Sequence, residues 1–299
     1  MAGPAATISL NIHQVEMERE GKLNPEPAVF GTQAARTMYA SLHGEFMPHP
    51  RPDALGKVSQ DAYSLFYARS AAMGWLAPAV EDGPDGLWGM NDAEAGSASG
   101  PRPSRVAYFQ VVLTGSSPEK VPPVQPFLSC AGDVVERLGR LRLEAVQVLL
   151  PERDADADGR PASPSGMAVA ASLLDALNWF ADCDPRRRAE VRITLDGGPD
   201  STIRAAAPGI VQWVQEIDQN VFSFDSLSLA DDDYLVLAPT TFYRGLADSD
   251  HHRVTLRGTL AEWSLDALGW LAAFLADVSS RHGTTTPLML TADRSAPSG

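Results

Sequence analysis

Hydrophobic and polar residues alternate with the two-residue period of a β-strand in several parts of the chain. The clearest case is the stretch 253–260, where Val254, Leu256 and Leu260 fall on one side and polar residues on the other. Such a pattern predicts a strand with one face on a hydrophobic core. The strands expected from alternation or from short apolar runs are residues 7–18, 105–114, 144–150, 191–196, 221–229, 234–238, 253–260 and 287–292.

Other stretches carry apolar residues three and four positions apart, as on the buried face of a helix. They predict helices at residues 32–46, 59–75, 127–139, 166–183, 209–220 and 264–281. Ser264 is expected to cap the last helix, because a serine hydroxyl accepts a hydrogen bond from a free N–H of the first turn. Residues 78–104 are rich in Gly, Asp, Ser and Pro and predict a loop, which Trp88 would hold against the body of the protein.

The word Leu-Asp-Ala-Leu-x-Trp occurs twice, at 174–179 and at 265–270. Each copy lies in a helix pattern, and each is followed by a short strand pattern that ends on an aspartate, Asp196 or Asp293. We interpret this as a duplicated β-α-β unit of the ferredoxin-like kind, in which two units share one sheet. The units comprise residues 144–150, 166–183 and 191–196, and residues 253–260, 264–281 and 287–292.

The predicted fold class is therefore α+β, with an antiparallel or mixed sheet, helices packed on it, and the duplicated unit in the C-terminal half. The length of 299 residues suffices for one large or two ordinary domains. We predict an N-terminal α+β domain at 1–150, an acidic linker at 151–165, and a C-terminal α+β domain at 166–299 that contains an insertion at 197–250.

The formal net charge of −14 argues against two classes of partner. Nucleic acid is disfavoured because neutralising phosphates requires clustered Lys and Arg, and an anionic membrane surface is disfavoured for the same reason. Only three of the 24 basic residues are lysines, Lys22, Lys57 and Lys120. With frequent Ala, Pro and Gly, this bias is typical of a bacterial genome rich in GC.

The compartment is predicted from the two cysteines and from the start of the chain. Cys130 and Cys183 have no metal-ligand spacing and lie in or beside apolar helix patterns, as free thiols do in a reducing compartment. Residues 1–10 lack the basic and apolar regions of a secretory signal, and no apolar run is long enough to span a membrane. We therefore expect a soluble, cytoplasmic protein.

Few residues have the arrangement that catalysis or metal binding requires. Asp248, Asp250, His251 and His252 form the densest group of potential metal ligands, but consecutive side chains on an extended segment point in opposite directions. We interpret this group as an exposed loop and expect no metal and no cofactor. His13 lies on the polar face of the strand pattern at 7–18 and is the candidate acid–base residue.

Trp179 and Trp270 are the candidate binding residues. On a helical wheel both lie about 200° from the centre of the buried stripe, at or beyond its edge. Tryptophan is enriched at the centres of protein interfaces. The sequence therefore predicts a non-catalytic interaction or assembly protein that binds a protein partner or itself. The alternative is a cofactor-independent enzyme, or a binding protein, for a small apolar molecule.

Overall fold

The computed structural model describes residues 36–50, 61–77, 86–99, 103–114, 121–151, 171–217, 219–229, 251–284 and 286–294. The expected strands at 7–18 and 234–238 lie outside these residues, as does the linker at 151–165 beyond its first residue. The division into two domains remains a prediction.

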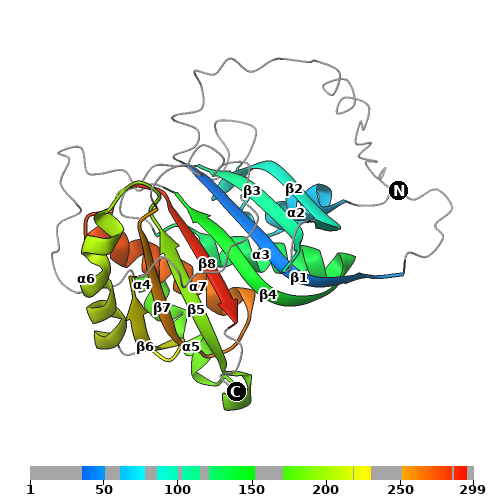
Figure 1. Cartoon of the computed structure of the whole chain (residues 1–299). Coiled ribbons are helices and arrows are strands. Elements are labelled where there is room, and N and C mark those ends of the chain that lie inside the picture. Colours follow the sequence, from blue (N-terminus) through cyan, green and yellow to red (C-terminus); the bar gives the residue numbers. More distant parts are fainter. Residues whose placement is uncertain are drawn as a thin grey trace, which may run out of the picture.

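The described strands form one sheet of eight, in the order β2-β3-β1-β4-β8-β5-β7-β6 (Figure 1). Every neighbouring pair is antiparallel. The strands are β1 (Thr37–Pro48), β2 (Trp88–Ser99), β3 (Arg105–Leu113), β4 (Gly139–Leu150), β5 (Ala189–Asp196), β6 (Phe222–Ser228), β7 (Arg253–Leu260) and β8 (Leu288–Arg294). The predicted α+β class with an antiparallel sheet is confirmed.

The described helices contribute buried residues to a core on one face of this sheet. They are α2 (Ala62–Ala72), α3 (Val124–Leu138), α4 (Ala171–Asp175), α5 (Leu177–Ala181), α6 (Thr202–Glu216) and α7 (Leu265–Arg281), and the short 3₁₀ helix η4 (Pro185–Arg187) lies between α5 and β5. Helices α3 and α7 lie behind the strands in Figure 1. The strands turn alternate residues to the core. Ala40, Val148 and Leu290 are examples, paired across β1, β4 and β8.

Helix α7 occupies the centre of the helical layer, and every residue from Ala267 to Ser279 is buried. It packs against α3 at Gly269, where a Cβ atom would lie only 2.6 Å from the Cα of Gln125. The expected cap is confirmed, because the Ser264 hydroxyl accepts a hydrogen bond from the backbone N–H of Ala267. A helix that is covered on all sides cannot show a single buried stripe.

The two halves of the chain repeat the same order of described elements. The first half runs β1-α2-β2-β3-α3-β4 and the second runs β5-α6-β6-β7-α7-β8, and the halves meet where β4 pairs with β8. Counted from each outer edge, the strand orders are β2-β3-β1-β4 and β6-β7-β5-β8. In this comparison the counterpart of α7 is α3. The duplication predicted from the repeated word is therefore not confirmed, and α6 and β6 are part of the main layers.

The predicted helix at 32–46 is wrong, because residues from Thr37 onward form strand β1. Met38, Leu42 and Phe46 are four residues apart, a spacing that suits one face of a helix but also one face of a strand. Residues 37–44 are all buried, as expected for a strand covered on both faces. The apolar pattern alone could not separate the two structures.

The predicted loop at 78–104 is also wrong over its second part, which forms the edge strand β2. Its Gly, Asp and Ser residues disfavour a strand, but pairing with β3 overrides that weak preference. Trp88 does hold this region against the body, as expected. Its ring is fully buried next to Phe66 and Phe127, and its indole N–H donates to the Ser70 hydroxyl.

Candidate functional site

The first copy of the repeated word forms the two short helices α4 and α5, and it presents the most exposed large apolar side chain among the described residues. Trp179 is 70% exposed, and Leu174 is 43% exposed. The segment is anchored from beneath by Leu173 and Phe180, whose side chains are buried in the core. Two buried anchors hold an exposed tryptophan in place, which limits the conformational entropy lost when it binds a partner.

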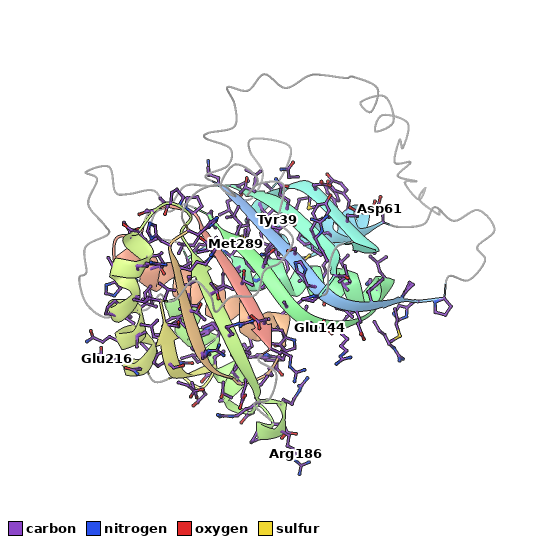
Figure 2. The ribbon with its side chains drawn as sticks, in the orientation of Figure 1. Tyr39, Asp61, Glu144, Arg186, Glu216 and Met289 are labelled. Atoms are coloured by element: carbon purple, nitrogen blue, oxygen red, sulfur yellow. The ribbon has the colours of Figure 1, made fainter. Side chains whose placement is uncertain are left out.

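Charged residues follow the exposed tryptophan a few positions later in the chain. Asp184 caps η4 by accepting a hydrogen bond from the backbone N–H of Arg186 at 3.0 Å. Arg187 forms an ion pair with Glu262 at 3.1 Å, which fixes η4 beside the start of α7. Arg186 and Arg188 are exposed, and Figure 2 shows Arg186 at the end of the molecule, pointing away from the body.

Trp270, the second candidate, lies in the core, and its predicted position at the edge of the buried stripe is wrong. Its side chain is 0% exposed and stacks on Phe274 with ring centroids 5.2 Å apart. Its indole N–H donates to the backbone carbonyl of Leu173 at 2.9 Å. Helix α4 thus lies over α7 and covers the side that the wheel left open. Only Trp179 remains a candidate binding residue.

The sheet face opposite the helices carries polar side chains in register across the strands. Tyr39, Leu149 and Met289 form a small apolar cluster on it, and Tyr39 and Met289 are labelled in Figure 2. The next row across the strands consists of Ser41, Gln147, Thr291, Thr194 and Thr255. In the following row Arg192 forms a bidentate ion pair with Asp293, with both N···O distances 3.0 Å.

Ser41 and His43 are the pair on this face that most resembles catalytic chemistry. The Ser41 hydroxyl lies 2.9 Å from Nε2 of His43, and Nδ1 lies 3.4 Å from the carbonyl oxygen of Pro103. A carbonyl only accepts, so a hydrogen bond to Pro103 requires the proton on Nδ1, and the Ser41 hydroxyl has the amide oxygen of Gln147 at 3.4 Å as a further acceptor. Burial lowers the pKa of His43 to about 4, although the Pro103 contact opposes this shift.

A neutral histidine beside a hydroxyl is the arrangement of an activated nucleophile. Ser41 and His43 are, however, 0% and 1% exposed, so a substrate has no access to either. The pair therefore serves the packing of the sheet. Sequence reasoning missed it because β1 was predicted as a helix, in which residues two apart do not share a face.

Of the predicted group of metal ligands, His251 and His252 belong to the described residues, whereas Asp248 and Asp250 lie outside them. Nδ1 of His251 lies 2.9 Å from the carboxylate of Asp196, which also accepts from Arg253 Nε at 2.9 Å. His252 interacts with a different carboxylate, that of Asp200. Burial raises the pKa of Asp200, but hydrogen bonds from Thr202 and Thr286 outweigh this effect, and the electrostatic interaction with His252 lowers the pKa further.

The two adjacent histidines thus serve different carboxylates, in agreement with their expected opposite directions. In the described part of the chain, no three His, Cys, Asp or Glu side chains are grouped to hold a metal ion. Arg253 already occupies the position next to Asp196 that a cation would take. His13, the candidate acid–base residue, lies outside the described residues.

A cavity of about 320 Å³ lies between α3, the start of β4 and the start of α7. Its apolar lining includes Leu141, Leu143 and Trp263, and its acidic lining includes Asp133 and Asp266. Burial raises the pKa of Asp266, and the nearby carboxylates of Glu262 and Asp133 raise it further, against a hydrogen bond with Ser129. Several of these residues adjoin the cap of α7, and no motif in the sequence indicates the cavity.

No family model, curated protein or solved structure matches this chain. No helix within the described residues combines the length and the apolar composition needed to cross a membrane.

Proposed function

We propose that the protein is a non-catalytic interaction protein that binds a protein partner through the α4–α5 segment. The observation that carries this proposal is the 70% exposure of Trp179. A tryptophan exposed to water contributes little to its own fold, but it is among the residues that most often dominate the binding free energy of an interface. Exposed Leu174 adds an apolar neighbour on the same segment.

The position of this segment in the topology supports the proposal. We interpret the two halves as ferredoxin-like plaits placed side by side, with α3 and α7 as equivalent helices. Helices α4 and α5 then belong to the connection from β4 to β5 and to neither plait. Segments that connect elements of a rigid scaffold frequently carry function, because the scaffold does not depend on their surface residues.

The cavity beside α7 favours a second function, a binding protein or cofactor-independent enzyme for a small apolar molecule. Its volume of about 320 Å³ is at the lower end of the range for ligand pockets. Its carboxylates make it the weaker proposal, because covering Asp133 and Asp266 with an apolar molecule would remove them from water at a cost in free energy. Native mass spectrometry of the full chain with a library of apolar compounds tests this function, and Leu143→Arg should abolish any adduct.

Photo-crosslinking tests the interaction function. A photoactivatable amino acid replaces the exposed Asn178, and the full chain is expressed and irradiated in the cells that naturally produce it. We expect discrete protein adducts that disappear when Trp179→Ala is added. The control places the same amino acid at exposed Gln215 on α6, where we expect no such adducts. Adducts that are equal at both sites, or indifferent to Trp179→Ala, would contradict the proposal.

A further inference from the structure

The cavity between α3, the start of β4 and the start of α7 combines an apolar wall with an excess of negative charge. Leu141, Leu143 and Trp263 form the apolar part of its lining. The indole N–H of Trp263 donates to the backbone carbonyl of Leu143 at 2.9 Å, which holds the ring in place. The apolar group of a ligand can therefore bury its surface against this wall without first ordering the ring.

The cavity is also lined by charged side chains, namely Asp133, Glu136, Asp266 and Arg187. The charge of Asp133 is offset by Arg69, which lies 2.6 Å from its carboxylate. The charge of Arg187 is offset by Glu262 at 3.1 Å. Within the described residues, Glu136 and Asp266 take part in no ion pair. The lining of the cavity therefore keeps a surplus of negative charge.

The carboxyl group of Asp266 is affected by this surplus charge. Burial raises its pKa, and the nearby carboxylates of Glu262 and Asp133 raise it further. These effects oppose the ionised form, and a positive charge placed beside Asp266 would favour it. The overall charge of −14 also attracts cations toward the protein. The cavity therefore favours a cation over a neutral or an anionic ligand.

The kind of cation follows from the spacing of the carboxylates and from the size of the cavity. Among the residues that the structure describes, no three His, Cys, Asp or Glu side chains are grouped closely enough to hold a metal ion. The volume of about 320 Å³ is about ten times the roughly 30 Å³ of a water molecule, so an organic cation of about ten non-hydrogen atoms fits. An ammonium group can donate three hydrogen bonds, and the face of a tryptophan ring attracts it.

We infer that this cavity binds a small organic ammonium ion, whose positive group lies at Asp266 and whose apolar body lies against Leu143 and Trp263. The ammonium group compensates the carboxylates for the water that the ligand displaces, which a neutral apolar molecule cannot do. This inference concerns a site away from the α4–α5 segment and does not depend on a protein partner there.

Isothermal titration calorimetry of the full chain with 2-phenylethylammonium chloride, at neutral pH and low salt, tests this inference. We expect saturable binding with a dissociation constant of about 1 mM or lower, as a ligand of this size allows. The matched neutral probe is 2-phenylethanol, which replaces the ammonium group by a hydroxyl and keeps the rest of the molecule. It should bind at least about tenfold more weakly, because it brings no charge to Asp266.

Two variants locate the bound ion. Asp266→Asn should weaken its binding at least about tenfold, because the change removes the charge and keeps the shape of the side chain. Glu136→Gln, at an exposed position on α3, should weaken it about threefold and does not disturb the core. The matched control is Asp175→Asn, the same change at an exposed position on α4 outside the cavity, which should alter binding less than about twofold. Circular dichroism confirms that each variant is folded.

Three outcomes would overturn the ammonium site. Equal affinity for 2-phenylethanol would show that the cavity selects only the apolar body of the ligand. Equal weakening by Asp266→Asn and Asp175→Asn would show that the ion is attracted by the overall charge and does not bind in the cavity. Absence of saturable binding up to about 10 mM would show that the cavity does not hold such an ion. None of these outcomes bears on Trp179-dependent crosslinks, so the proposed interaction function stands or falls separately.

Discussion

The two copies of Leu-Asp-Ala-Leu-x-Trp end in tryptophans with opposite environments. Trp270 is 0% exposed in a 17-residue helix, whereas Trp179 is 70% exposed in a five-residue helix. The shared six-residue motif therefore determines neither the length of the helix nor the burial of the tryptophan. The difference arises from the surroundings of each copy. Helix α7 is covered by the sheet, by α3 and by α4, whereas α5 lies on the outside.

The largest expected effect is on the buried copy. Trp270→Ala should lower the free energy of unfolding by about 3–5 kcal/mol, because it leaves a cavity beside Phe274 and an unpaired carbonyl at Leu173. Trp270→Phe keeps most of the volume and loses the N–H donor, so it should cost clearly less. Urea unfolding at neutral pH measures both values. A loss below about 1 kcal/mol for Trp270→Ala would mean that the ring is not in the core.

The same contrast between interior and surface extends to histidine. His43 is buried with a pKa lowered to about 4, against 6.5 for an ordinary histidine. Above pH 6.5 both folded and unfolded states hold it neutral. As the pH falls below 6.5, the unfolded state takes up the proton first, and the folded protein loses up to about 3 kcal/mol of stability before the loss levels off near pH 4.

The measurement is the free energy of unfolding from pH 7.5 to 4 in wild type and in His43→Gln, which cannot titrate. We expect the wild type to lose more stability than the variant over this interval. His49→Gln, at an exposed position just after the same strand, is the matched control and should retain the wild-type slope. Parallel curves for wild type and His43→Gln would show that His43 is not held neutral in the fold.

Sequence reasoning located the elements whose local signals agree with their surroundings. The strand at 253–260 has one apolar and one polar face, and β7 has the predicted bounds. The cap at Ser264 placed the start of α7. Sequence reasoning failed where burial on both faces of a strand or pairing with a neighbouring strand decided the structure, as in β1 and β2. The exposure of Trp179 was suggested by its place on the wheel, whereas the burial of Trp270 depends on the packing of α4 over α7, which no local pattern reveals.

The helix caps give a smaller test of why one copy forms a long helix. Ser264 caps α7 with its hydroxyl, whereas Ala176 at the corresponding position of α5 has no side chain that can do so. Ser264→Ala should cost about 1 kcal/mol, and Ser264→Asp should restore most of it, because a carboxylate also accepts the N–H of Ala267. Equal unfolding curves for the two variants would indicate that the hydroxyl does not cap the helix.

The smallest expected effect on stability belongs to the exposed copy. Trp179→Ala removes a ring that is 70% exposed, so the monomer should lose no more than about 0.5 kcal/mol. Urea unfolding of the wild type and the variant at the same low protein concentration measures this difference. A large loss of stability would place Trp179 in the core, and the contrast between the two copies would disappear.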